Sequence, residues 1–320
     1  MKRLSSKYAY LFDKEDAVAG NARRKLQHRQ VCGYRTRLVK AGDVLEVALY
    51  PIWNTQEQVN RAKQHSNPEA QRKQNRKDAI RRLIWKLNAN FTAEDLHITL
   101  TYAPGTEPTT EEQARRDMKN LLRRIRRYLK REHLPDLKRY LYVIEWADAE
   151  GKATRVHHHL IIQGMDRKVV EDLWGKGYAN ADRLQPDEHG LEALGRYLSK
   201  GRNSTGEGKR RRAWACSKGL KQPEIQTVDH KVSRRKVEEL ATDCQGNAPE
   251  IFNGLFNKRG YRYNGDCVVR TSPYVAGAYI TATLHRDPQL KQNATKAAGS
   301  RRQHTTDGVG TTASHGKVPG

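Results

Sequence analysis

The segment of residues 139–163, RYLYVIEWADAEGKATRVHHHLIIQ, decides the fold that we predict for the centre of this chain. Its two ends, RYLYVIEW and VHHHLIIQ, have the aromatic and β-branched or aliphatic content of strands, and the turn-forming ADAEGKATR lies between them. Together they predict an antiparallel hairpin with strands at 139–146 and 156–163. The elements on either side of this hairpin then determine the fold class.

The patterns around the hairpin follow a regular order. Upstream, LHITLTY (96–102) alternates apolar and polar residues like a half-buried strand, and residues 111–132 carry their apolar residues on one helical stripe. Downstream, we predict a short helix at 166–174, a strand at 176–184 and a helix at 187–200. This order predicts an α+β fold, in which a small antiparallel-dominated sheet has helices packed on one face.

The flanks of this core differ from it in composition. Residues 44–53, VLEVALYPIW, predict one strand, and residues 61–88 are strongly basic and predict a helix from about Pro68. The last 30 residues are rich in Gly, Thr and Ser and have too little apolar content to fold. We therefore divide the chain into an N-terminal extension (1–90), a core (91–205), a mixed C-terminal accessory region (206–290) and a disordered tail (291–320).

The charge of the chain points to a polyanionic partner. Sixty Lys and Arg residues against 36 Asp and Glu residues give a net charge of +24. No run approaches the roughly 20 apolar residues of a membrane-spanning helix, and the N-terminus lacks the apolar stretch of a secretion signal, so a cytoplasmic protein is expected. The four cysteines form no CxxC pair, which argues against a disulfide framework and against a zinc finger.

Three consecutive histidines lie in the second strand of the hairpin. His157 and His159 share one face and His158 takes the other, because side chains alternate along a strand. Two imidazoles about 7 Å apart along the strand can converge on one divalent ion. Glu145 on the first strand is a natural cross-strand third ligand, and such a set suits Mg²⁺, Mn²⁺ or a catalytic metal with open positions. The alternative is a hairpin with surface histidines that bind nothing.

A second candidate group is YLSK (197–200), at the end of the last predicted helix of the core. Tyr197 and Lys200 are three positions apart and share a helical face. A tyrosine hydroxyl, with its ordinary pKa near 10, becomes a usable nucleophile when a cation or a metal-polarised substrate is close. Taken alone, this spacing more often marks a packed tyrosine and a solvated lysine.

In combination, ITLTY (98–102), HHHLII (157–162) and YLSK resemble the three motifs of the HUH rolling-circle replication initiators, the single-strand endonucleases of small phages and plasmids. The resemblance runs from Leu96 to Lys200. His158 stands where the family has a hydrophobic residue, and Gly201 stands where its two-tyrosine members have a second tyrosine. The chain therefore looks like a single-tyrosine member.

The resemblance implies an HUH endonuclease core, similar to an RRM in architecture. It implies that His157, His159 and Glu145 hold Mg²⁺ or Mn²⁺, that Tyr197 attacks the scissile phosphate, and that Lys200 orients the substrate or stabilises charge. The product would be a 3′ hydroxyl and a 5′-phosphotyrosine, which later allows strand rejoining. The implied partners are single-stranded origin DNA and a host helicase and polymerase, in the host cytoplasm if a phage encodes the protein.

Basic and aromatic side chains are the candidates for further DNA contacts. The cations expected to bind phosphates are Arg123, Arg126, Arg127, Arg210, Arg211 and Arg212. The aromatics that could stack on unpaired bases, although core packing is the commoner role, are Trp214, Tyr261, Tyr263 and Tyr274.

Two other classes of protein fit the same pattern less well. A single-tyrosine transposase or a relaxase would share the fold, but relaxases carry a third histidine in the metal motif and an early tyrosine, and small transposases are shorter. A non-catalytic RRM-like nucleic-acid-binding protein would have a similar order of elements. RRMs present aromatics on their central strands, where this chain has His157, His159 and Glu145.

Overall fold

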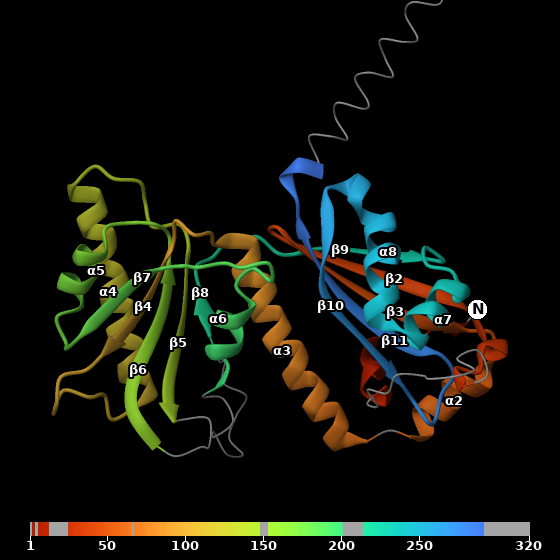
Figure 1. Ribbon diagram of the computed structural model, residues 1–320. Helices are drawn as coiled ribbons and strands as arrows, with labels where there is room; N and C mark the ends of the chain where they lie inside the picture. The colour runs from red at the N-terminus through yellow and green to blue at the C-terminus, as the bar shows by residue number, and fades with distance from the viewer. Residues whose placement is uncertain are drawn as a thin grey trace, which may run out of the picture.

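The computed structural model describes residues 2–3, 6–12, 25–65, 67–147, 153–200 and 214–290. Within these residues the chain forms two antiparallel sheets, and a long helix, α3, runs between them (Figure 1). The α+β class predicted from the sequence is therefore confirmed. Every helix in the described part of the chain is too short or too polar to span a bilayer.

The five-stranded sheet has the strand order β7-β4-β6-β5-β8. Its strands are β4 (Leu96–Thr101), β5 (Tyr140–Ala147), β6 (Ala153–Ile162), β7 (Ala179–Arg183) and β8 (Ala215–Cys216). Strands β5 and β6 form the predicted hairpin, in which Glu145 lies opposite His157. On the other side of β6, Thr101 of β4 also lies opposite His157, and Thr99 lies opposite His159. The register therefore aligns polar residues of three strands in rows.

Helices cover both faces of this sheet, whereas the sequence predicted helices on one face. Helices α4 (Glu111–Arg131) and α5 (Arg167–Trp174) lie on one face and pack against the apolar residues of β4 and the alternate residues of β6. Helices α3 (Pro68–Asn90) and α6 (Glu192–Tyr197) cover part of the other face. This second layer forms because Leu141, Val143 and Ile161 are apolar residues on that face and must be removed from water.

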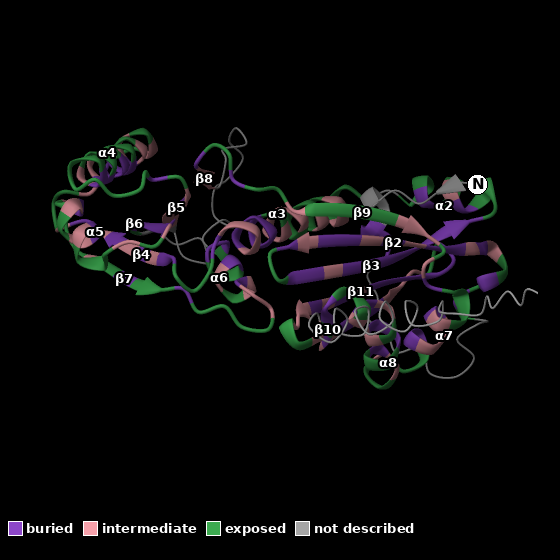
Figure 2. Ribbon diagram, turned by 90° about the horizontal axis from the view of Figure 1, so that it is seen from above, coloured by how far each residue is buried: buried purple, intermediate pink, exposed green. Residues whose placement is uncertain are grey.

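A six-stranded sheet joins both flanks of the core. Its order is β10-β11-β3-β2-β9, with β1 paired to β3, and all of its pairs are antiparallel. Its strands are β1 (Lys2–Arg3), β2 (Val31–Ala41), β3 (Val44–Trp53), β9 (Glu224–Asp229), β10 (Tyr261–Thr271) and β11 (Ala278–Arg286). Strand β3 is the predicted strand at 44–53, and it is nearly all buried (Figure 2). Segments that composition assigned to separate regions are thus hydrogen-bonded neighbours.

Three helices complete the part of the molecule around the six-stranded sheet. They are α2 (Gln56–Gln64), α7 (Arg234–Thr242) and α8 (Cys244–Phe256). Their apolar residues share one core with β2, β3, β10 and β11. Cys244 of α8 and Cys267 of β10 form a disulfide, although the cysteine spacing argued against a disulfide framework. The two residues are 23 positions apart, and only the packing of α8 on β10 brings them together.

Helix α3 contacts both sheets. Leu83 and Leu87 pack into the core of the five-stranded sheet. On the other side of the helix, the Trp85 indole N–H donates to Glu46 of β3 (3.1 Å), and the Arg81 guanidinium is 3.0 Å from the same carboxylate. Since one helix makes both sets of contacts, it fixes the five-stranded sheet and whatever packs on its open face to the rest of the molecule.

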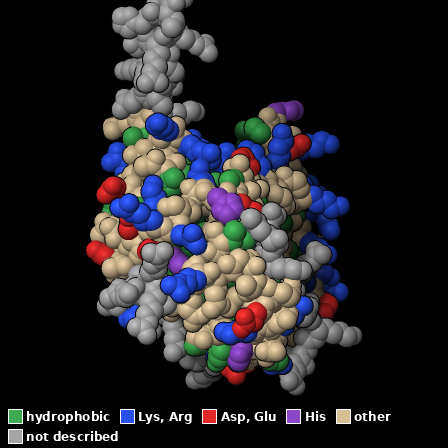
Figure 3. Space-filling view, turned by 90° about the vertical axis from the view of Figure 1, so that its right-hand side faces the viewer, with side chains coloured by type: hydrophobic (Ala, Val, Ile, Leu, Met, Phe, Trp, Pro, Cys, Tyr) green, Lys and Arg blue, Asp and Glu red, His purple; other side chains and the backbone are tan. Residues whose placement is uncertain are grey.

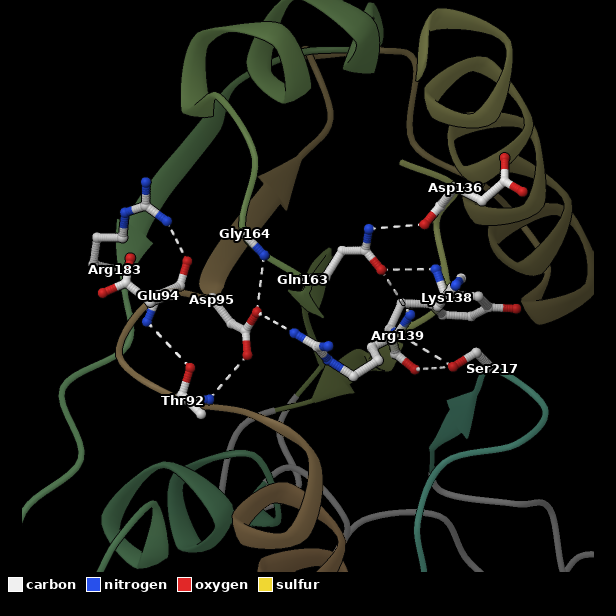
Figure 4. A network of polar contacts seen from close by, with 11 residues as sticks. Thr92, Glu94, Asp95, Asp136, Lys138, Arg139, Gln163, Gly164, Arg183 and Ser217 are labelled. Carbon is white, nitrogen blue, oxygen red and sulfur yellow. Dashed lines mark hydrogen bonds and ion pairs between the residues drawn. The ribbon is translucent and has the colours of Figure 1, made fainter. Parts of the chain in front are cut away.

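A buried carboxylate holds three strands together at the end of the sheet away from the hairpin turn (Figure 4). Asp95, just before β4, is only 1% exposed. One of its oxygens accepts from the Gly164 backbone N–H (2.8 Å) and from the Arg139 guanidinium (3.0 Å), and the other accepts from the Thr92 N–H (2.9 Å). Gln163 adds a second clasp, because its carbonyl oxygen accepts from the Arg139 N–H (3.1 Å). These bonds fix the starts of β4 and β5 and the end of β6.

We predict that Asp95→Ala lowers the free energy of unfolding by about 2–4 kcal/mol, because it leaves buried donors without an acceptor and unpairs Arg139. Urea denaturation followed by circular dichroism measures this change. The matched control is Glu94→Ala, which removes an exposed carboxylate from the neighbouring position and should change stability by no more than about 0.5 kcal/mol. Equal effects of the two substitutions would contradict the clasp.

Candidate active site

The three predicted metal ligands converge. One ligand atom each from Glu145, His157 and His159 lies within 4.8 Å of the others. A single carboxylate oxygen, Glu145 Oε2, is 3.1 Å from Nε2 of both histidines. This follows from the strand register, since His157 is opposite Glu145 and His159 is the next residue on the same face of β6. The cluster can hold a metal ion.

The ring of His157 is oriented by the backbone of its own strand. Its Nδ1 lies 2.9 Å from the carbonyl oxygen of Arg155. A carbonyl only accepts hydrogen bonds, so the neutral ring carries its proton on Nδ1. The lone pair on Nε2 then points into the cluster, which is the arrangement of a metal-binding histidine with an outer-shell partner.

His97 of β4 orients His159 in a similar way. Its Nε2 is 3.2 Å from Nδ1 of His159, and the two rings are stacked with centroids 5.3 Å apart. Burial lowers the pKa of His97, and burial together with the neighbouring histidines lowers the pKa of His159 to about 3. Both rings are therefore neutral at physiological pH. When His159 donates from Nδ1 to His97, its Nε2 is free to bind a metal.

His97 was not among the site residues predicted from the sequence. A signal was present, because His97, Thr99 and Thr101 are the polar residues of an alternating strand. The pairing of β4 beside β6 gives this pattern its meaning, since it aligns Thr99 with His159 and Thr101 with His157.

The donor chemistry of the cluster fits a divalent cation. Two neutral imidazoles and a carboxylate are three of the ligands that such ions accept, and they leave coordination positions open for substrate. Glu145 and His157 are partly exposed, whereas His159 is buried. One side of the cluster is therefore reachable from solvent.

The tyrosine and lysine predicted from YLSK lie beside this cluster. Tyr197 is the last residue of α6, and its ring centroid is 5.2 Å from that of His159 and 6.4 Å from that of His97. Lys200 Nζ is 5.7 Å from the centroid of the tyrosine ring. The Tyr197 side chain is 45% exposed. Partial burial and the charge of Glu145 raise its pKa.

Helix α3 determines where Tyr197 lies. Asn88 of α3 accepts a hydrogen bond from the Leu191 N–H (2.7 Å) at the start of α6. Two residues before the tyrosine, Gly195 faces Ile84 so closely that a Cβ atom would clash with that side chain. Glycine thus permits a close contact between the two helices, and the buried Leu198 anchors the chain just after Tyr197.

The third histidine points away from the cluster, as the alternation predicted. His158 is fully buried on the face covered by α4 and α5, and its Nε2 is 2.8 Å from the Tyr102 hydroxyl. That hydroxyl donates to Asp117 (3.2 Å), which also pairs with Lys176 (3.0 Å). Burial lowers the pKa of His158 to about 4, so it is neutral at physiological pH.

The arginines predicted to bind DNA lie elsewhere. Arg123, Arg126 and Arg127 belong to α4, which covers the sheet face opposite to the cluster. Arg126 lines a groove of about 700 Å³ at the edge of the five-stranded sheet, and no described lining residue of this groove is acidic. The other cations of the groove are Lys138, Arg139, Lys218 and Lys221. Arg210, Arg211 and Arg212 lie outside the described residues.

The four aromatics suggested for base stacking mostly pack within the protein. Tyr261 and Tyr263 are buried in the core of the six-stranded sheet, and Trp214 packs against the core of the five-stranded sheet. Tyr274 is 44% exposed and stacks on His65, with ring centroids 4.0 Å apart.

Residues 95–202 match a family model described as Replication-associated protein ORF2. The matched segment contains β4, the hairpin with the Glu145, His157 and His159 cluster, and both Tyr197 and Lys200. The match confirms the resemblance of this segment to replication-associated proteins. No curated protein and no solved structure matches the chain.

We predict that wild-type protein binds one Mn²⁺ per chain and that Glu145→Gln or His157→Ala abolishes this binding, because each removes a ligand. His97→Ala should weaken it about 10- to 100-fold, since the orienting partner of a ligand is removed. Isothermal titration calorimetry measures the affinities. His65→Ala, which removes a histidine outside the cluster, should leave them unchanged. Unaltered Mn²⁺ affinity in the ligand variants would contradict the assignment.

Proposed function

We propose that this protein initiates DNA replication by nicking single-stranded origin DNA through a covalent 5′-phosphotyrosine intermediate, and that it later rejoins the strands. One observation carries the proposal: the Tyr197 ring lies 5.2 Å from the ring of His159, which belongs to a three-residue cluster suited to a metal. The match of residues 95–202 to replication-associated proteins supports the same role.

In this proposal Glu145, His157 and His159 hold Mg²⁺ or Mn²⁺. When bound, the cation supplies a Lewis acid for the scissile phosphate and offsets the Glu145 charge that raises the pKa of Tyr197. The chain itself contributes the geometry, because the backbone carbonyl of Arg155 and the ring of His97 orient the two imidazoles.

The chemical step belongs to Tyr197. Its hydroxyl oxygen attacks the phosphorus in line, so that a tyrosyl O–P bond forms and the P–O3′ bond breaks. The phenol loses one proton and the departing 3′ oxygen gains one, which balances the step. Since the raised pKa keeps the phenol protonated near neutral pH, the proton leaves as the attack proceeds. Lys200, whose ammonium is 5.7 Å from the ring centroid, stabilises the developing negative charge.

The covalent link explains how rejoining needs no ATP. A phosphotyrosine ester retains the transferable phosphoryl group of the original diester, so a later 3′ hydroxyl can displace Tyr197 and restore the strand. A single tyrosine is sufficient for this sequence of steps, and Gly201 stands where a second tyrosine would be expected.

Basic side chains supply affinity for the DNA backbone. The groove with Arg126, Lys138 and Lys218 is a candidate for phosphate contacts, because its described lining has cations and no carboxylate. On the face of the molecule shown in Figure 3, Lys and Arg side chains lie in several groups with Asp and Glu among them. We infer cooperation with a host helicase and polymerase in the cytoplasm, since a nicking protein needs unwinding and synthesis to complete replication.

We predict that Tyr197→Phe abolishes the covalent adduct with labelled single-stranded origin DNA and keeps non-covalent binding, because only the hydroxyl is removed. Denaturing electrophoresis with Mn²⁺ detects the adduct, and a chelator should prevent its formation. Tyr274→Phe is the matched control, since its side chain is about equally exposed (44% against 45%) and lies away from the cluster. An adduct formed by the Tyr197→Phe protein would sink the assignment of the nucleophile.

We predict that the double variant Lys218→Ala, Lys221→Ala weakens single-stranded DNA binding at low salt. The slope of log K against log[salt] should fall in magnitude by about 0.7 for each phosphate that is no longer neutralised. Fluorescence anisotropy over a range of salt concentrations measures the slope. The control is Arg235→Ala, Lys236→Ala on α7, which removes the same charge from another surface. Identical slopes in both double variants would rule out a specific role for the groove.

A further inference from the structure

The cluster occupies only part of the sheet face on which it lies. The row of residues that begins with Glu145 and His157 continues through Thr101 of β4. Strand β7 lies beyond β4, and the Thr101 N–H donates to the carbonyl oxygen of Tyr178, just before β7 (2.8 Å). The row therefore ends in Tyr178, two strand spacings or about 10 Å from His157.

The same side of the sheet remains polar next to this row. Thr99 lies opposite both His159 and Asn180, and His97 lies opposite Asp182. Directly opposed residues of antiparallel strands project to the same face. The outer half of this face, on β4 and β7, thus carries hydroxyl and amide groups, and Asn180 is exposed.

Tyr178 is the most exposed large apolar side chain in the described part of the chain, at 73%. Within that part, its ring makes no aromatic stacking, cation–π or hydrogen-bonding contact with another side chain. Neither core packing nor an internal hydrogen bond accounts for a tyrosine at this position. An exposed aromatic beside a polar sheet surface is suited to stack on a flat ligand.

The backbone that carries Tyr178 is held firmly. The Ala103 N–H donates to the Lys176 carbonyl (2.8 Å), two residues before the tyrosine. Gly177 has φ +154° and lies so close to the backbone of Thr101 and Ala103 that a Cβ atom would clash with it. Because the chain is fixed on this side, the ring is presented with little freedom to lose when a ligand binds.

We propose that Tyr178 is a base-stacking residue for the single-stranded DNA substrate, and that it holds an unpaired base near the scissile phosphate. The inference rests on the proposed function, because it takes the phosphate to be bound at the Glu145, His157 and His159 cluster. A base attached near that phosphate can reach a ring in the same row of the sheet. Thr101 and Asn180 supply hydrogen-bonding groups to the nucleotide beside it.

The test compares two labelled strands, an oligothymidylate and an abasic strand of the same length that keeps the phosphates and lacks the bases. Equilibrium binding is measured by fluorescence anisotropy with full-length protein and a chelator, so that no cleavage occurs. Tyr178→Ala should raise the Kd for oligothymidylate at least about five-fold and leave the Kd for the abasic strand unchanged. Tyr178→Phe, which keeps an aromatic face, should bind oligothymidylate with the affinity of the wild-type protein.

The control is Ile225→Ala, which removes an exposed apolar side chain of β9 in the six-stranded sheet. An unchanged Kd for oligothymidylate in Tyr178→Ala would overturn the proposal, and so would equal weakening of both strands, which would indicate a structural role. Because the measurement needs neither metal nor cleavage, it is separate from the adduct assay. A wild-type protein that stacks on bases and forms no adduct would refute the nicking chemistry alone.

Discussion

The alternation of side chains along β6 is the constraint on which the candidate site depends. Successive residues of a strand project to opposite faces, so His157 and His159 share the open face and His158 enters the core. Pairing with β5 then sets Glu145 opposite His157 without any further loop or cofactor. A shift of the β5 register by one residue would send Glu145 to the other face and dissolve the cluster. The clasp at Asp95 matters for this reason, because it fixes the register from the opposite end of the same strands.

The tyrosine reaches the cluster by a different route. Tyr197 is on a short helix that has too few residues to be stable alone, and its position is determined by contacts with α3. The same α3 is bound to the six-stranded sheet through Trp85 and Arg81. The nucleophile is thus positioned by residues outside the segment that matches the replication-associated family, which begins at residue 95. This gives the second sheet and α3 a role in the chemistry, since they support the helix that carries the tyrosine.

What the sequence could predict separates along the same lines. Local patterns were sufficient for the hairpin, for α4 and for the face shared by His157 and His159, because periodicity is a property of neighbouring residues. They could not predict that residues 31–53 and 224–286 share one sheet, since strand pairing across such a distance leaves no local signal. The disulfide between Cys244 and Cys267, the orienting role of His97 and the exposure of Tyr178 all follow from this long-range pairing. Each required the fold before its residue could be interpreted.

His158 shows how a departure from the family motif is accommodated. The position calls for a residue that packs beneath the cluster and adds no positive charge there, because a cation would oppose the binding of a metal ion. A hydrophobic side chain meets both requirements directly. Here a histidine meets them because burial lowers its pKa to about 4 and keeps it neutral, while the Tyr102 hydroxyl satisfies Nε2. Tyr102 in turn donates to Asp117, whose charge is balanced by Lys176. The substitution is therefore tolerated through a chain of polar contacts that ends at a paired carboxylate and leaves the strand neutral under the site.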